Sequence, residues 1–284
     1  MRRVVSMLAP LALVAGVVVA GVVPPATAEA ASSRPQTYLA LGDSLAFGYS
    51  PLVSPASAGN FIGYPSTVAA ALKLRLTNAG CPGETSSHFV DLAGIDNNCG
   101  FWHANFPLHA AYSTTQLAYA DAFLKSHPQT LVVSIDIGAN DVQALVNRCG
   151  GMAEVGCIQT GLPGVLASLY ANLDTIYGHI RNLDGYHHKL VAVTTYSTNY
   201  GDPLLTGVVA QINAVVADRT LAWNGIMADG FGAFAAASAA KGGDACAAGL
   251  LIVVKSAPLT CDSHPSPAGR DLMARAIVNA LRPD

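Results

Sequence analysis

Residues 37–46 read TYLALGDSLA, an apolar run that ends in Gly-Asp-Ser. The run has the length and the composition of a buried strand, and Gly42 and Asp43 are common turn residues. Ser44 therefore stands directly after a predicted strand, where it could be a turn residue, a helix cap or a nucleophile. The tripeptide alone does not choose among these roles, because Gly, Asp and Ser occur in most turns.

Three further apolar runs have the length of strands: residues 74–78, 130–137 and 189–195. Their nearly continuous apolarity is typical of strands that are covered on both faces. Helical periodicity is found between and after them, in residues 65–73, 114–125, 162–183, 207–223 and 266–281. The alternation of strands and helices predicts a three-layer α/β/α sandwich with a central parallel sheet. In such sheets, ligands bind beyond the carboxyl ends of the strands.

Three connections are predicted as long loops at this carboxyl edge, where ordered loops commonly form the walls of a site. They are residues 49–63, 81–113 and 142–161. The second loop carries three histidines, His88, His103 and His109, which either border the cleft or pack outside it. It also carries Trp102, whose side chain we expect in the core.

Residues 1–30 have the layout of a secretory signal peptide. Arg2 and Arg3 form a basic start, residues 4–23 are almost wholly apolar, and Ala28-Glu29-Ala30 is a small-x-small cleavage pattern. An uncleaved membrane anchor is the alternative, but the prolines and the cleavage pattern favour removal. We therefore expect a secreted mature chain of residues 31–284, forming one domain, with no stable membrane insertion after cleavage.

The mature chain is weakly acidic. Residues 1–30 hold 2 of the 15 basic and 1 of the 18 acidic residues, which leaves 13 positive against 17 negative charges. This balance, without a cluster of Lys or Arg, argues against nucleic acid or an anionic membrane as a partner. The sequence has no Cys-x-x-Cys and its histidines are scattered, so a zinc site has little support and we expect no metal. We also expect a protein without a cofactor, and a monomer.

Six cysteines follow the signal segment, an even number that predicts three disulfides in an exported chain. Several pairings are formally possible. We favour pairing of nearest neighbours, which closes three short loops: Cys81–Cys99, Cys149–Cys157 and Cys246–Cys261.

Polar segments follow the predicted strands and precede the last predicted helix: GDS at 42–44, PGET at 82–85, GAND at 138–141 and DSHP at 262–265. Because the carboxyl ends of parallel strands meet at one edge of a sheet, these segments are expected to converge. Together they supply a nucleophile, a base, an orienting acid and donors for an oxyanion, the groups that acyl transfer needs.

The four segments resemble the four blocks of the SGNH, or GDSL, hydrolase family, in the family's order and over most of the mature chain. The resemblance implies the flavodoxin-like SGNH hydrolase fold. It also implies an esterase or lipase of the secreted bacterial type that works through an acyl-enzyme.

The resemblance assigns roles to individual residues. Ser44 matches the family's nucleophile and His264 matches its general base. The oxyanion hole would be formed by the backbone N–H groups of Ser44 and Gly83 and by the side-chain amide of Asn140. A side chain at position 83 would block the approach of the acyl oxygen, which explains a glycine there.

The acid of the catalytic triad departs from the family pattern. The family places it three residues before the histidine, where this chain has Cys261, whereas Asp262 lies two residues before His264. Three arrangements are open: Asp262 orients the ring through an altered turn, a backbone carbonyl near Cys261 does so, or another acid does. We favour Asp262.

The substrate expected from this reading is a small-molecule or lipid ester. A polysaccharide or cell-wall deacetylase is the alternative enzyme, and a non-catalytic glycan-binding SGNH module is the alternative from another class. A long apolar channel would favour acyl-ester hydrolysis, whereas an open polar groove with exposed aromatic rings would favour deacetylation. The chain has no G-x-S-x-G, so it lacks the nucleophile elbow of α/β-hydrolases.

Overall fold

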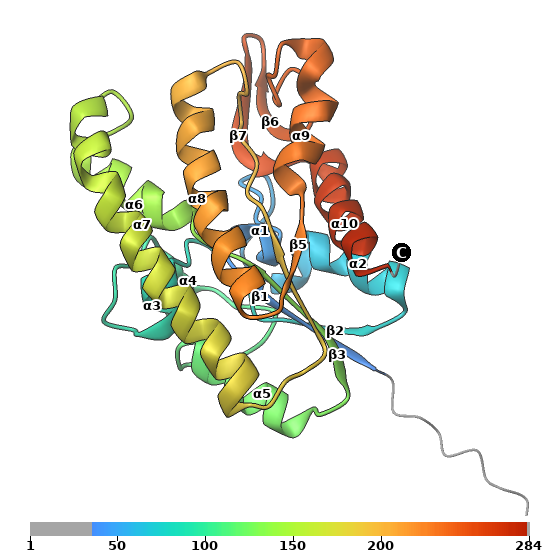
Figure 1. Cartoon of the computed structure of the whole chain (residues 1–284). Helices are drawn as coiled ribbons and strands as arrows, with labels where there is room; N and C mark the ends of the chain where they lie inside the picture. The colour runs from blue at the N-terminus through green and yellow to red at the C-terminus, as the bar shows by residue number, and fades with distance from the viewer. Residues whose placement is uncertain (1–35, 283–284) are drawn as a thin grey trace, which may run out of the picture. The chain divides into compact units, whose positions relative to one another are not determined.

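Five parallel strands form the central sheet of the structure, a computed structural model that describes residues 36–282 (Figure 1). The order across the sheet is β2-β1-β3-β4-β5, with bounds β1 (Thr37–Gly42), β2 (Arg75–Asn78), β3 (Thr130–Asp136), β4 (Lys189–Val193) and β5 (Ile226–Ala228). This is the flavodoxin-like order, in which the topology switches between β1 and β3. The predicted signal peptide, residues 1–30, lies outside the described residues.

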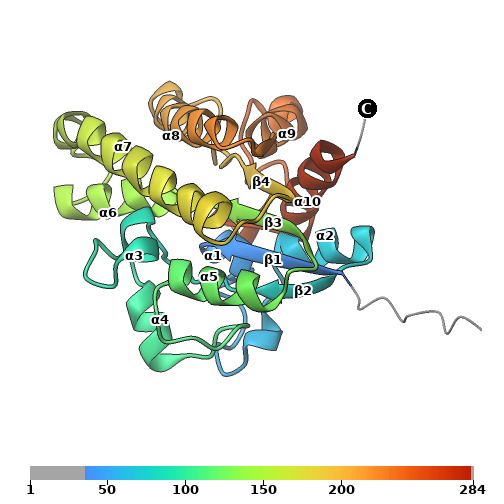
Figure 2. The same cartoon turned by 60° about the horizontal axis from the view of Figure 1, so that its bottom comes forward.

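Helices cover both faces of the sheet, which confirms the predicted three-layer sandwich (Figure 2). Leu39 and Leu41 of β1 face one core, whereas the alternating Tyr38 and Ala40 face the other. The first core is closed by α3 (Ser86–Val90), α5 (Gln116–Ser126), α6 (Ala139–Cys149), α7 (Val155–Gly178) and α8 (Pro203–Ala222). The second is closed by α1 (Ser44–Phe47), α2 (Tyr64–Leu72), α9 (Gly230–Ser238) and α10 (Pro267–Leu281). Among residues 36–282, no helix has both the length and the apolarity to cross a bilayer.

The connection predicted as a loop at 142–161 is instead helical, and that prediction is wrong. It holds most of α6 and the first turns of α7. Gly138, in a left-handed conformation, starts α6 without a side-chain cap, so the usual start signal is missing from the sequence. Leu145 and Val146 pack into the first core, and this burial stabilises the helix.

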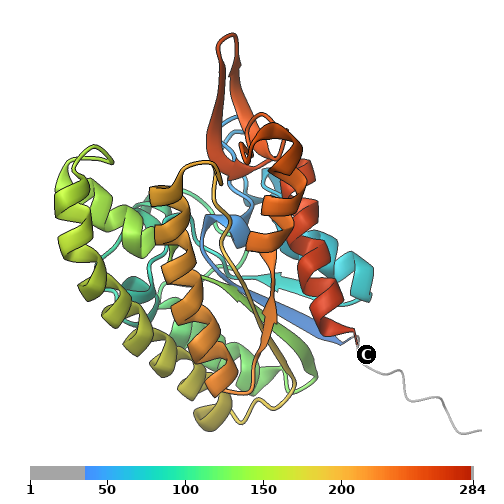
Figure 3. The same cartoon turned by 45° about the horizontal axis from the view of Figure 1, so that its top comes forward.

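The segment before the last helix is also more regular than predicted. β6 (Leu251–Ser256) and β7 (Leu259–Pro265) form an antiparallel hairpin, the red-orange arm at the top of Figure 3. The disulfide Cys246–Cys261 joins β7 to the chain before β6. The two remaining disulfides are Cys81–Cys99 and Cys149–Cys157, so all three are pairs of nearest neighbours.

Gly42 ends β1 at a point where no other residue fits. Its φ is 130°, and a Cβ built on it would lie 2.2 Å from the carbonyl oxygen of Asp136, its neighbour on β3. Glycine adopts such a φ at little cost, whereas an L side chain is strained there. The close approach of these two strand ends therefore depends on the missing side chain.

We predict that Gly42→Ala lowers the free energy of unfolding by about 3 kcal/mol or more, because positive φ and a backbone clash add together. Urea denaturation followed by circular dichroism measures the change. Gly164→Ala in α7 is the control: its added Cβ meets nothing within 4 Å, and alanine should stabilise the helix by about 0.5–1 kcal/mol. A loss below about 1 kcal/mol for Gly42→Ala would contradict the argument.

Candidate active site

Ser44 lies at the carboxyl end of β1, as the first residue of the short helix α1. Asp43 caps this helix by accepting a hydrogen bond from Leu45 N at 2.8 Å, so the cap is Asp43 and not Ser44. The Ser44 hydroxyl is therefore free of a capping role. Its Oγ lies 2.8 Å from Nε2 of His264.

His264 connects Ser44 to Asp262. Its Nδ1 lies 2.5 Å from Oδ1 of Asp262, and the same carboxylate oxygen accepts the backbone N–H of His264 at 2.9 Å. With a proton on Nδ1 donated to Asp262, Nε2 is an acceptor facing the Ser44 hydroxyl. This chain of contacts has the order nucleophile, base and acid that activates a serine.

The two-residue spacing works because β7 bulges at this point. Cys261 and Pro265 pair with Val253 and Leu251 of β6, which leaves residues 262–264 opposite a single residue of β6. In this bulge the Asp262 carboxylate folds back to accept the backbone N–H of His264 and to contact its ring, whereas Cys261 is bonded to Cys246. The structure therefore brings Asp262 into contact with His264, although the spacing of the two residues departs from the family pattern.

Two tyrosines hold this segment of β7 in place. The Tyr196 hydroxyl donates to the carbonyl oxygen of Ser263 at 2.7 Å, between the acid and the histidine. Tyr49 packs edge-on against the His264 ring, with 4.7 Å between the ring centroids. The sequence analysis identified neither tyrosine, because nothing near them in the chain shows which loop they contact.

Gly83 lies in the wall of the same cavity as Ser44 and His264. Its φ is 84°, and a Cβ there would lie 1.9 Å from the carbonyl oxygen of Asn97. The backbone at this position therefore requires glycine. Its packing against residue 97 is a reason for the glycine that the sequence analysis did not identify.

Asn140 lies in the first turn of α6 and borders the same cavity. Its Nδ2 donates one hydrogen bond to Oδ2 of Asp43 at 3.1 Å, and its Oδ1 accepts one from Asn97 at 2.9 Å. These contacts fix which end of the amide carries the N–H groups. Nδ2 has two N–H groups, and the second is the one suited to a developing oxyanion.

A cavity of about 660 Å³ extends from these polar groups. Ser44, Gly83, Asn140 and His264 border it. The rest of the lining comes largely from α6, α7 and α8, with the aromatic side chains Tyr49, Trp102 and Tyr196 also in contact with the cavity. The helical walls are mainly apolar, with Val142, Val146, Ile158, Leu162, Val208 and Ile212 among the residues that line them. No Lys or Arg lines the cavity within residues 36–282.

The contacts between Asp262 and His264 on β7 favour the ionised form of Asp262. The hydrogen bond with the His264 ring lowers the pKa of Asp262, and the backbone N–H of His264 lowers it further, against the effect of burial. Asp262 is therefore a carboxylate at neutral pH. A carboxylate in contact with Nδ1 stabilises the ring after it accepts a proton.

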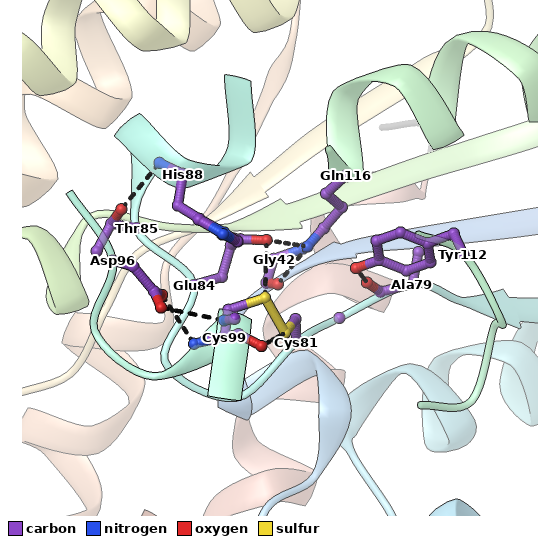
Figure 4. The surroundings of a disulfide bond; sticks show 12 residues. Gly42, Ala79, Cys81, Glu84, Thr85, His88, Asp96, Cys99, Tyr112 and Gln116 are labelled. Carbon is purple, nitrogen blue, oxygen red and sulfur yellow. Dashed lines mark hydrogen bonds and ion pairs between the residues drawn. A yellow bond between two sulfur atoms is a disulfide. The ribbon is translucent and has the colours of Figure 1, made fainter. Parts of the chain in front are cut away.

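A buried hydrogen-bond network between Gln116, Gly42 and Glu84 stabilises the turn that precedes Ser44 (Figure 4). The amide of Gln116 accepts from Gly42 N at 2.6 Å and donates to Gly42 O at 3.0 Å and to Glu84 Oε2 at 3.1 Å. Glu84 Oε1 in turn lies 2.7 Å from His88 Nδ1. Both polar groups of the Gly42 backbone are satisfied by one side chain from α5.

The histidines of the second long connection lie outside the cavity. His88 pairs with Glu84, His109 Nε2 lies 3.0 Å from Phe47 O, and His103 packs against Tyr112. Trp102 is buried as expected, and it also reaches the cavity wall.

Two groups of potential metal ligands occur in the part of the chain that the structure describes. One comprises Cys81, Cys99 and His103, and the other Glu84, His88 and Cys99. Both include a cysteine of the Cys81–Cys99 disulfide. A disulfide sulfur is not the thiolate that binds a metal ion, so neither group offers three metal ligands.

The fold and the site define a three-layer α/β/α protein with a serine and a histidine in contact beyond the carboxyl ends of a parallel sheet. The model of the GDSL-like lipase/acylhydrolase family matches residues 40–272, and the chain belongs to this family. It is a carboxylic ester hydrolase.

Solved structures of the same fold include phospholipase A1 from Streptomyces albidoflavus NA297, with 19% identity and a TM-score of 0.57 over 87% of this chain and 100% of that chain. A catalytic mutant of Axe2, an acetylxylan esterase from Geobacillus stearothermophilus, has 18% identity and a TM-score of 0.55 over 88% and 95% of the two chains. No curated protein sequence matches this chain.

We predict that Asp262→Asn lowers kcat for ester hydrolysis by about 10²–10⁴-fold, because the amide no longer stabilises the charged ring of His264. Steady-state kinetics with a p-nitrophenyl ester measure the loss. Ser263→Ala is the matched control, since it keeps the carbonyl group that Tyr196 binds and should stay within threefold of wild type. Equal, small effects of the two substitutions would assign the orienting role to the backbone.

Proposed function

We propose that this chain is an exported serine esterase that cleaves esters of apolar carboxylic acids through an acyl-enzyme. In this proposal Ser44 is the nucleophile, His264 the general base and Asp262 its orienting acid. The observation that carries the proposal is the continuous contact from Ser44 Oγ to His264 Nε2, and from His264 Nδ1 to Asp262.

The first half-reaction forms the acyl-enzyme. Ser44 Oγ attacks the ester carbonyl carbon while His264 Nε2 accepts the hydroxyl proton. The carbonyl oxygen becomes an oxyanion that receives hydrogen bonds from the backbone N–H groups of Ser44 and Gly83 and from Nδ2 of Asn140. As the tetrahedral intermediate collapses, His264 donates its proton to the leaving alkoxide and the alcohol departs.

The second half-reaction returns the enzyme to its starting state. Water attacks the acyl carbon of the Ser44 ester, and His264 accepts one of its protons. The same three donors bind the second oxyanion. Its collapse breaks the bond to Ser44 Oγ, which takes the proton back from His264, and the carboxylic acid is released.

The apolar walls of the cavity support an acyl chain longer than acetyl. Burying each CH₂ of such a chain stabilises the complex by about 0.8 kcal/mol, and the walls from α6, α7 and α8 extend the cavity well beyond the carbonyl site. Of the two enzyme alternatives, these walls favour acyl-ester hydrolysis over removal of acetyl groups from a polysaccharide. The contact between Ser44 and His264 argues against a non-catalytic glycan-binding module.

Three disulfides support an exported protein, because such bonds persist in oxidising compartments. We propose that residues 1–30 are removed on export and that the mature enzyme is a monomer. The proposed chemistry uses only side chains and backbone groups of this chain, and it requires no cofactor.

We predict that Ser44→Ala lowers hydrolysis of p-nitrophenyl butyrate by about 10⁴-fold or more, while the circular dichroism spectrum stays that of the folded protein. A fluorophosphonate probe should add its mass to the wild type and not to the variant. Turnover or labelling retained in Ser44→Ala would overturn the assignment of the nucleophile.

We predict that kcat/KM rises along a series of p-nitrophenyl esters from acetate to octanoate, because longer chains bury more apolar surface in the cavity. Val208→Trp should fill part of the cavity and lower kcat/KM for octanoate at least about tenfold, with little effect on acetate. Ala210→Trp, on the exposed side of α8, is the control. Highest activity on acetate in the wild type would favour a deacetylase instead.

A further inference from the structure

A row of hydrogen-bonded side-chain amides lies along the wall of the active-site cavity. Gln143 Nε2 donates to Asn147 Oδ1 at 3.0 Å, and Asn147 Nδ2 donates to Asn97 Oδ1 at 3.0 Å. Asn97 Nδ2 then donates to Asn140 Oδ1 at 2.9 Å, and Asn140 Nδ2 donates to Asp43 Oδ2 at 3.1 Å. Asn97 and Asn140 both border the cavity, so the row reaches the proposed oxyanion hole.

The direction of these hydrogen bonds is set at Asp43. This carboxyl group accepts at both oxygens, because Leu45 N donates to Oδ1 at 2.8 Å. Asn140 therefore presents its Nδ2 to Asp43 and its Oδ1 to Asn97. An amide oxygen needs a donor as its partner, and Nδ2 of Asn97 supplies it. The amide of Asn140 is thus held at both ends, which fixes the direction of the second N–H of Nδ2.

The backbone of Asn97 lies against the other proposed donor. A Cβ on Gly83 would lie 1.9 Å from the carbonyl oxygen of Asn97. The disulfide Cys81–Cys99 closes the segment that contains both residues. Asn97 therefore connects the segment of one proposed oxyanion donor to the side chain of the other, Asn140.

We propose that Asn97 is a positioning residue of the oxyanion hole, whose side-chain amide orients and polarises the amide of Asn140. The proposal rests on the proposed function, because it takes Asn140 as an oxyanion donor. A single hydrogen bond to Asp43 leaves the Asn140 amide free to rotate about that bond, whereas a second one at Oδ1 fixes its plane. The bond at Oδ1 also strengthens the N–H groups of the same amide, because hydrogen-bonded chains are cooperative. Asn97 acts on the transition state through Asn140 and not by contact with the substrate.

Asn97→Ala and Asn97→Asp test this role. Alanine removes the donor, whereas aspartate keeps the shape of the side chain and places a carboxylate oxygen against Oδ1 of Asn140. We expect Asn97→Ala to lower kcat about 5–30-fold and Asn97→Asp to lower it at least as much, with KM nearly unchanged, because part of an oxyanion donor is lost. Wild-type kcat in Asn97→Asp would overturn the role as a donor.

Asn105→Ala is the matched control. Asn105 is an exposed asparagine of α4 (Cys99–Asn105), and its Nδ2 donates to Phe101 O at 2.8 Å. Its loss removes a side-chain amide from the same connection without touching Asn140, so kcat should stay within about twofold of wild type. An equal loss of kcat in Asn105→Ala and Asn97→Ala would overturn the specific role of Asn97.

A double-mutant cycle determines whether Asn97 acts through Asn140. Asn140→Ala removes the donor itself and should lower kcat about 10²–10³-fold. In that background Asn97→Ala should lower kcat by less than about twofold, because no amide remains to be oriented. A residue that only stabilises the loop, or that touches the substrate, would lower kcat by the same factor in both backgrounds, and this result would overturn the proposal.

An inhibitor that forms an oxyanion tests the same role without turnover. Ser44 Oγ adds to the carbonyl carbon of an alkyl trifluoromethyl ketone, the hydroxyl proton passes to His264, and the ketone oxygen becomes the oxyanion. The inhibition constant should rise in Asn97→Ala by the factor by which kcat falls, because both report binding of an oxyanion. An unchanged inhibition constant with reduced kcat would overturn the proposal.

These experiments separate the inference from the proposed function. Failure of the proposed nucleophile is detected by turnover retained in Ser44→Ala, whatever the effect of Asn97. A loss of kcat below about threefold in Asn140→Ala would remove Asn140 from the oxyanion hole and overturn the role of Asn97, while the serine mechanism would stand. Urea unfolding followed by circular dichroism gives the folded fraction of each variant, and kcat is expressed per folded enzyme.

Discussion

The contact between Gly42 and Asp136 is the constraint on which the active site depends. The ends of β1 and β3 approach so closely that a Cβ on Gly42 would lie 2.2 Å from a backbone oxygen. These strands border the point at which the topology of the sheet switches direction, where ligands bind in folds of this kind. The close approach of the strand ends brings the start of α1, with Ser44, beside the first turn of α6, with Asn140. The Gln116 amide binds both backbone polar groups of Gly42 at this point.

Asp43 links the ends of these strands to the residues around Ser44. Its carboxylate caps α1 and accepts a hydrogen bond from the amide of Asn140, and its backbone N–H donates to Asp136, so one buried residue connects the start of α1, Asn140 and the end of β3. Low dielectric strengthens each of these hydrogen bonds and makes an unpaired charge costly. Residues 42–44 therefore connect the end of β1 to the end of β3. The contacts around Ser44 come from residues far away in the sequence, such as Asn140 and His264.

Much of the sheet was predictable because buried parallel strands are short, continuous apolar runs. β5 was missed because its three residues are too few for a pattern, and α6 because Gly138 starts it without a side-chain cap. Ser44, Gly83, Asn140 and His264, each predicted from a short segment, border one cavity. Asn97, Gln116 and Tyr196 were missed because their partners lie 43, 74 and 67 residues away.

The sequence by itself determined four of the five strands of the sheet, their alternation with helices and the reactive segments that follow the strands, because these depend on local periodicity and turn chemistry. Only the tertiary structure decided that Asp262 reaches His264. Cys261 and Pro265 pair with β6, and the irregular register between them lets the Asp262 carboxylate accept the backbone N–H of His264 and contact its ring. The Tyr196 hydroxyl binds the carbonyl oxygen of Ser263 in this stretch from 67 residues away. A contact of that separation leaves no local pattern in the sequence, which is the physical reason why the contact between Asp262 and His264 becomes visible only in the folded protein.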